Sequence, residues 1–157
     1  MQHSESVGVL TRLGSPPARW TYVVAWMMVI FLASADSSSG SHSSAIVDTV
    51  IHFLRIEPSP AQLELTNHLF RKAAHFTEYG ILGLLWAWAL PQGPYRLILA
   101  WTAATLYAGS DEFHQLFVAS RGPALTDVGI DSAGAATALL LGWTLRRPAL
   151  TRQRNKS

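Results

Sequence analysis

A short stretch in the second half of the chain concentrates the residue types that can do chemistry. It covers residues 107–131 and reads YAGSDEFHQLFVASRGPALTDVGID. An acid pair, a histidine, a glutamine, an arginine and two further aspartates lie there between apolar segments. A charge beside membrane-length apolar sequence is costly unless it is paired or functional, so this stretch is the first candidate for a functional site.

A second polar segment, RKAAHFTEY at residues 71–79, precedes it in the chain. Crowded carboxylates beside a histidine suit general acid and base catalysis, since ionisation of one carboxylate disfavours ionisation of the next. Lysine and arginine bind phosphate or carboxylate, and arginine can do so through two parallel hydrogen bonds. The catalytic candidates are Glu78, Asp111, Glu112 and His75, and the binding candidates are Lys72, Tyr79, Gln115, Arg121, Asp127 and Asp131.

Metal binding is the weaker interpretation of these residues. His75 with Glu78, and Asp111 with His114, each place two ligand types one helical turn apart, but this spacing alone is common. The chain has no cysteine, which excludes disulfides, thiolate nucleophiles and cysteine-ligated zinc. His68 lies among apolar neighbours without a spaced partner, and we interpret it as an interfacial residue. We therefore predict no metal and no cofactor.

The composition indicates a membrane protein. The 157 residues are typical of one domain in length, and 49% are hydrophobic whereas only 14% are charged. About a quarter of the residues in a soluble domain are charged, so this chain is too apolar for that class. We predict an all-α polytopic membrane protein with four transmembrane helices in a compact bundle. The predicted spans are residues 20–35, 69–90, 95–118 and 127–145.

Local signals predict the remaining elements. Residues 45–56 have apolar positions at helical spacing but are too few to span, which predicts a short helix on the membrane surface. Ser59 and Pro60 form a favourable N-cap and first position for the following helix. Thr126 can cap the last helix, whose small residues at positions 132–136 allow close helix packing.

Helical periodicity places the polar residues of three spans on single faces. At about 100° per residue, each of these helices has a polar stripe at the same depth. Burying the stripes against one another avoids exposing ionised groups to lipid. The stripes are Arg71, His75, Glu78, Tyr79 and Leu82; then Tyr107, Asp111, His114 and Gln115, with Glu112 off to one side; and finally Asp127, Asp131, Gly134 and Ala138.

The distribution of bases predicts the orientation. The N-terminal lead, the turn at residues 91–96 and the C-terminal tail hold eight bases and one acid, whereas the other two loops with their flanking helix ends hold four bases and nine acids. Because bases collect on the cytoplasmic side, both termini are predicted to be cytoplasmic and the polar segments to meet at the outer face. The tail lacks interleaved aromatic residues, which favours a cytoplasmic anchor over a nucleic-acid-binding segment.

The first apolar segment has two interpretations. Arg12 and Arg19 precede it and Ala33-Ser34-Ala35 ends it, a pattern that also resembles a signal peptide cleaved after Ala35. The lead before the apolar run is long for a signal peptide, which favours a retained helix. With the helix retained, the predicted organisation is a flexible cytoplasmic lead at residues 1–18, a membrane domain at 19–146 and a basic cytoplasmic tail at 147–157.

The polar residues also follow a family pattern. KAAHFTEYGILG and DEFHQLFVASRGPALTDVGIDSAGA resemble the VanZ-like family of small bacterial membrane proteins, and the resemblance covers about residues 20–145. The family pattern is Lys-x-x-His-Phe-x-x-Tyr-Gly-x-Leu, then Asp-Glu-x-x-Gln-x-Phe-x-x-x-Arg, then Asp-x-x-x-Asn-x-x-Gly. The matching positions are Lys72, His75, Phe76, Tyr79, Gly80, Leu82, Asp111, Glu112, Gln115, Phe117, Arg121, Asp127 and Gly134.

Two positions depart from that pattern. Asp131 stands where the family usually has asparagine, and Ala119-Ser120 stands where Pro-Gly is common. The resemblance implies an integral protein of the bacterial cytoplasmic membrane, in a family named for a member linked to low-level resistance to the glycopeptide teicoplanin. It does not imply a settled biochemical activity, so the question of catalysis stays open.

Three functions fit these observations. The first is recognition or modification of an envelope component at the outer leaflet, such as a lipid-linked precursor or a glycolipid head group, with an effect on glycopeptide susceptibility. The second is a structural polar network without catalysis. The third is proton or ion-coupled transport, which is weaker because the inner half of every predicted span lacks ionisable residues for a relay.

Overall fold

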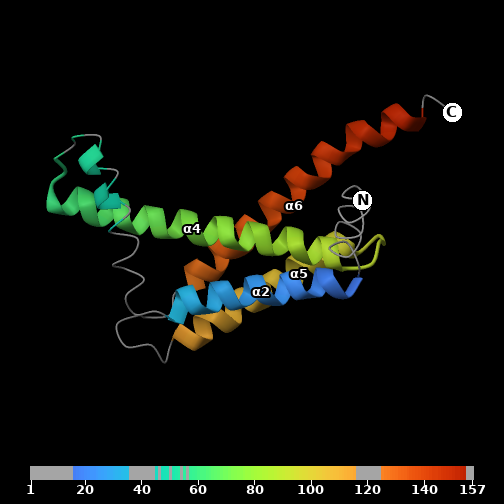
Figure 1. Ribbon diagram of the computed structural model, residues 1–157, viewed down its shortest axis with the longest axis horizontal. Helices are drawn as coiled ribbons and strands as arrows, with labels where there is room; N and C mark the ends of the chain where they lie inside the picture. The colour runs from blue at the N-terminus through green and yellow to red at the C-terminus, as the bar shows by residue number, and fades with distance from the viewer. Residues whose placement is uncertain are drawn as a thin grey trace, which may run out of the picture.

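The computed structural model describes residues 16–35, 45, 47–49, 51–53, 55, 57–115 and 125–154. These residues are helical apart from short turns and include no strand, which confirms the all-α prediction. The described residues form four long helices, which Figure 1 labels. They are α2 (Pro16–Ala35), α4 (Pro60–Ala89), α5 (Arg96–Gln115) and α6 (Leu125–Arg154).

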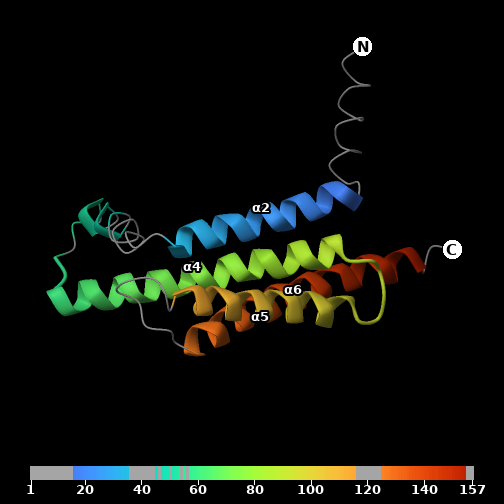
Figure 2. The same ribbon diagram turned by 90° about the horizontal axis from the view of Figure 1, so that it is seen from below.

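The four helices alternate in direction. The start of α2, the turn between α4 and α5, and the second half of α6 lie toward one end of the molecule (Figures 1 and 2). The end of α2, the end of α5 and the start of α6 lie toward the other end. This is the alternation expected of four successive antiparallel helices joined into a bundle.

The helices differ in length. At 1.5 Å per residue, the 20 residues of α2 or α5 extend about 30 Å and the 30 residues of α4 about 45 Å. The first turns of α4 therefore project beyond the ends of α2 and α5, as Figure 1 shows. We call residues 60–71 the α4 arm.

The start of α4 agrees with the predicted signals. Ser59 is the N-cap, Pro60 occupies the first helical position, and Gln62 completes a capping box. The Gln62 backbone N–H donates to the Ser59 hydroxyl at 3.4 Å, and the Ser59 backbone N–H donates to the Gln62 side-chain oxygen at 2.8 Å. Two of the free N–H groups at the helix start are thus satisfied locally.

Other helix ends differ from the predicted bounds. The first helix begins at Pro16 rather than residue 20, because proline is tolerated in a first turn where its missing N–H costs nothing. The last helix runs over Leu125–Arg154, so Thr126 lies inside its first turn rather than capping it. Residues 45, 47–49 and 51–53 are helical where a short helix was predicted, and Arg55 follows in the left-handed region with a φ of 54°.

Small residues bring α4 and α6 close together in the most extensive helix contact of the bundle. A Cβ added at Gly134 would clash with the backbone carbonyl of Phe76. At Gly80 an added Cβ would lie 3.3 Å from the Cβ of Ala138, and at Gly83 it would lie 3.2 Å from the Cβ of Ala135. The predicted close packing through small residues is confirmed, since a glycine at each point gives the neighbouring helix room.

The outer surface of the bundle is apolar, whereas its interior contains small and polar residues. Leu32 of α2, Leu106 of α5 and Leu145 of α6 are each more than half exposed. By length and composition, the described residues contain two helices able to cross a membrane, Pro16–Ser34 and Leu125–Leu145. The two further spans and the predicted orientation remain predictions.

Candidate functional site

Polar side chains from all four helices gather toward the end of the bundle where α2 and α5 end and α6 begins. The structure places all the predicted site residues that it describes there, buried or half-buried, in what we call the polar cluster. Its members from α4 lie just beyond the arm, where the four helices first pack together. The cluster comprises Ser34, Lys72, His75, Glu78, Tyr79, Asp111, Glu112, His114, Gln115, Asp127 and Asp131.

Asp111 is a buried carboxylate of the polar cluster, with only 4% of its surface exposed. Its Oδ2 atom accepts a hydrogen bond of 2.7 Å from the Ser34 hydroxyl and a longer one of 3.4 Å from the Gln115 amide. Its Oδ1 atom is buried and has no hydrogen-bond partner in the part of the chain that the structure describes. Oδ2 is therefore held by hydrogen bonds from α2 and α5, whereas Oδ1 is available to accept a further hydrogen bond.

Lys72 and Asp127 form an ion pair that joins α4 to the first turn of α6. The Thr126 hydroxyl donates to the same Asp127 oxygen at 3.2 Å. Both charged side chains are about three-quarters or more buried. Lys72, a predicted binding residue, is thus already paired with a carboxylate within the protein.

His75 faces the second aspartate of α6. Its Nδ1 atom lies 3.8 Å from the Oδ1 atom of Asp131, a distance too long for a hydrogen bond but suited to a charge interaction when the imidazole is protonated. Asp131 is only 2% exposed, and within the described ranges its Oδ1 atom accepts no hydrogen bond. Asp131, the departure from the family pattern, is therefore a second buried carboxylate with an unused acceptor.

Two tyrosines lie beside these acids, with ring centroids 6.3 Å apart. The Tyr107 hydroxyl donates to the Met27 carbonyl at 2.6 Å. Tyr79 is fully buried, and its hydroxyl makes no hydrogen bond to any described residue. The buried Nδ1 atom of His114 also lacks a hydrogen-bond partner among the described residues, although its ring packs on Phe31 at 4.6 Å.

The two glutamates of the polar cluster are positioned differently. Glu78 is half-buried on α4, close enough to Asp111 for their charges to interact. Glu112 lies off the predicted polar stripe of α5, one residue after Asp111, yet it is also buried, at 7% exposed. α5 packs against α6, α4 and α2, so more than one of its faces is buried.

Ser34 is a residue of the polar cluster that sequence reasoning missed. It was considered only as part of a cleavage motif, yet it is buried and donates to Asp111. The signal that would have found it is its register, since Val23, Ile30 and Ser34 are spaced by seven and four residues and form the buried face of α2. Arg121, a predicted binding residue, lies outside the described residues.

Metal ligation has no geometric support in the described segments, where no three His, Asp or Glu side chains are grouped to hold a metal ion. His75 with Glu78, and Asp111 with His114, therefore remain separate pairs in that part of the chain. The polar cluster offers hydrogen-bond acceptors and charges instead.

Fold and site together define a small helical-bundle protein with an apolar surface and a polar cluster toward one end. The family model VanZ/LLP1 matches residues 19–146, and the chain belongs to this family, as the sequence resemblance predicts. No curated protein and no solved structure matches the chain.

Proposed function

We propose that the chain is a bacterial cytoplasmic-membrane protein whose polar cluster recognises the polar head group of an envelope component at the outer leaflet. The observation that carries the proposal is the set of buried polar atoms without a hydrogen-bond partner in the described structure: Asp111 Oδ1, Asp131 Oδ1 and the Tyr79 hydroxyl. Buried polar groups are nearly always hydrogen-bonded. Several such atoms without a partner in one cluster are therefore suited to form hydrogen bonds with a ligand, for example with its hydroxyl or ammonium groups.

The surface of the bundle supports a membrane setting. Large apolar side chains face outward on all four helices, where a bilayer would cover them. Bases concentrate toward the end opposite the polar cluster, which supports cytoplasmic termini and an outward-facing cluster. α2 contributes Ser34 to the cluster and buries Val23 and Ile30, which supports its retention as the first span.

The contacts of the candidate residues support a different role for each of them. Lys72 is neutralised by Asp127, so its first role is to hold α4 on α6. Asp111 and Asp131 carry the free acceptor atoms and are the binding groups. Glu78, Glu112 and His75 lie beside them and would act as general acid and base if the bound component is also modified.

A structural polar network is the second candidate, and two observations favour it. The contacts from Ser34 to Asp111 and from Lys72 to Asp127 each join two helices, as hydrogen bonds do in membrane bundles. A transport function has less support, because the core toward the opposite end consists of apolar residues and offers no relay. That core includes Trp86, Ala87, Leu90, Leu97, Ala100, Trp101 and Leu139.

Variants that remove charge separate these candidates, and the two that replace an acid by its amide also keep the shape of the side chain. Glu78→Gln, Asp111→Asn and Arg121→Ala are expected to abolish an effect of the protein on teicoplanin susceptibility while its abundance in the membrane stays near wild type. Glu57→Gln, an exposed acid outside the polar cluster, is the matched control and should change neither quantity. If abundance falls in proportion to the phenotype, the network is structural and the recognition proposal is wrong.

Orientation is tested independently of function. Alkaline phosphatase fused after Ser157 should be inactive and a cytoplasmic reporter at the same position active. The opposite pair of activities would place the polar cluster on the cytoplasmic side and contradict recognition at the outer leaflet.

A further inference from the structure

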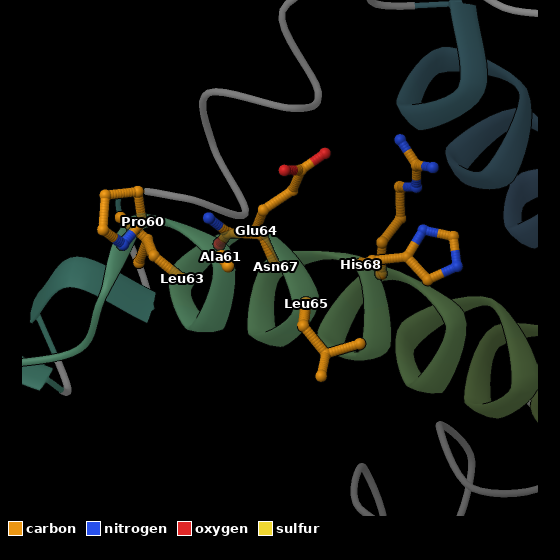
Figure 3. Close-up of a pocket in the computed structure, with 8 residues that line it drawn as sticks. Pro60, Ala61, Leu63, Glu64, Leu65, Asn67 and His68 are labelled. Carbon is orange, nitrogen blue, oxygen red and sulfur yellow. The ribbon is translucent and has the colours of Figure 1, made fainter.

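A hollow of about 730 Å³ lies against the α4 arm, next to the polar cluster. Figure 3 shows this hollow with its lining side chains, and Glu64 and Leu65 leave the helix on opposite sides. Its described lining comes entirely from the arm and combines apolar with polar residues. The lining residues are Pro60, Ala61, Leu63, Glu64, Leu65, Asn67, His68 and Arg71.

The polar lining of the hollow continues directly into the polar cluster. Glu64, His68, Arg71, His75 and Glu78 follow one another at spacings of four, three, four and three residues. On a helix this spacing keeps all five side chains on one face. A single polar stripe on α4 therefore leads from the hollow to the buried carboxylates.

The basic side chains of the hollow are available to a ligand. Arg71 is half-buried and makes no ion pair or hydrogen bond with any described residue, whereas its neighbour Lys72 is paired with Asp127. His68 is exposed and likewise has no ion-pair partner in the described ranges. The side-chain oxygen of Asn67 is buried without a hydrogen-bond partner among those residues. An anion would therefore meet Arg71 and His68 without breaking an existing pair.

The length of α4 determines where the hollow lies relative to the bilayer. If the 20-residue helices span the roughly 30 Å hydrocarbon layer, the end of the arm nearest the bundle, which carries His68 and Arg71, lies in the head-group layer that adds about 5–8 Å on each side. Leu65, Leu69 and Phe70 are exposed on the arm, as expected for side chains that reach into lipid. His68 and Arg71 then lie at the level of the lipid phosphates, and the first turns of the arm extend beyond it.

We propose that this hollow binds the phosphate-bearing head group of a membrane lipid, with Arg71 and His68 on the phosphate and Asn67 on a donor of the head group. The guanidinium of Arg71 can hold two phosphate oxygens at once, and the leucines of the arm contact the adjoining acyl chains. This inference rests on the proposed function and names the part of the ligand that lies outside the polar cluster. The remainder of the head group extends along the stripe toward His75 and the free acceptors of Asp111 and Asp131.

Lipid binding by the full-length protein in detergent tests the proposal. The probe is fluorescent phosphatidylglycerol, and the matched lipid is glucosyl diacylglycerol with the same chains, which has a polar head group but no phosphate. Phosphatidylglycerol should bind at least about tenfold more tightly, a difference that one charge-assisted bidentate contact supplies. Arg71→Ala should remove about that factor and His68→Ala a smaller part, with Arg71→Lys intermediate because lysine cannot form the bidentate contact.

Arg96→Ala is the matched control, because it removes the same charge near the opposite end of the bundle and should leave affinity unchanged. Equal affinity for the two lipids, or an equal loss in Arg71→Ala and Arg96→Ala, overturns the proposal. Displacement of the lipid by inorganic phosphate alone, at concentrations similar to those of competing lipid, assigns the hollow to a free anion and also overturns it.

The same assay separates this inference from the proposed function. If Asp111→Asn weakens binding whereas Arg71→Ala does not, head-group recognition by the polar cluster stands and the hollow is not its phosphate site. If the protein binds neither lipid, both proposals fail together. Thermal unfolding of Arg71→Ala at the wild-type temperature establishes that an affinity loss does not come from misfolding.

Discussion

The contact between α4 and α6 and the polar cluster beside it bury their residues in opposite ways. Along the contact, Gly80, Gly83 and Gly134 face alanines or backbone so closely that an added Cβ would be crowded or would clash. In the polar cluster, Asp111, Asp131 and Tyr79 are equally buried, yet each leaves a polar atom without a hydrogen bond in the described structure. Buried polar groups are nearly always hydrogen-bonded, so the acceptors left over in the polar cluster make it the candidate site, whereas the α4–α6 contact is scaffold.

The largest effect is expected from breaking the scaffold. Gly134→Ala places a methyl group against the Phe76 carbonyl and forces α6 away from α4, so the free energy of unfolding should fall by about 3 kcal/mol. Gly109→Ala is the control, because nothing lies within 4 Å of an added Cβ there. Chemical unfolding in detergent measures both variants. Equal stability of the two would show that the α4–α6 contact is not tight at Gly134.

An intermediate effect is expected where scaffold and site meet. Ser34→Ala removes the donor to Asp111 Oδ2, so the free energy of unfolding should fall by about 1.5 kcal/mol. Ser34→Thr keeps the hydroxyl and should restore most of the loss if the added methyl group fits. Asp111→Ala, which removes both carboxylate oxygens, combined with Ser34→Ala completes a double-mutant cycle in unfolding experiments. Strict additivity in that cycle would contradict a direct Ser34–Asp111 contact.

The smallest effect on stability is expected inside the candidate site. Tyr79→Phe removes a buried hydroxyl that has no partner among the described residues, so the free energy of unfolding should change by less than about 0.5 kcal/mol. Its effect on teicoplanin susceptibility should nevertheless be large if the hydroxyl contacts a ligand. Wild-type susceptibility in this variant would remove Tyr79 from the site and leave it a packing residue.

Much of this arrangement was predictable, because it depends on local rules. Ser59 and Pro60 mark the start of α4 through their own backbone chemistry, and the polar stripes of α4, α5 and α6 follow from helical spacing. His75, Asp111 and Asp131 therefore meet as predicted. Glycine and alanine in α6 likewise predict a close contact without naming its partner.

The remaining features depend on contacts that spacing alone does not determine. Glu112 is buried because α5 packs against three helices, whereas a single polar stripe implies one buried face. Ser34 joins the site only because the Val23 and Ile30 face of α2 turns inward. The α4 arm is missed by hydropathy, since Gln62 and Glu64 are good helix formers that continue a helix beyond its apolar segment.

The close contact between Gly134 and Phe76 also determines the register of α6 against α4 at the site. Gly134 follows Asp131 by three residues, and Phe76, its contact on α4, directly follows His75. A slide of α6 by one helical turn, about 5.4 Å, would part His75 from Asp131 and Lys72 from Asp127 at once. One residue inserted between positions 131 and 134 would rotate both aspartates by about 100° while leaving the glycine contact intact. An insertion just after Gly134 would instead rotate Ala135 and Ala138 away from Gly83 and Gly80, so close contacts fix the register of α6 on both sides of the site.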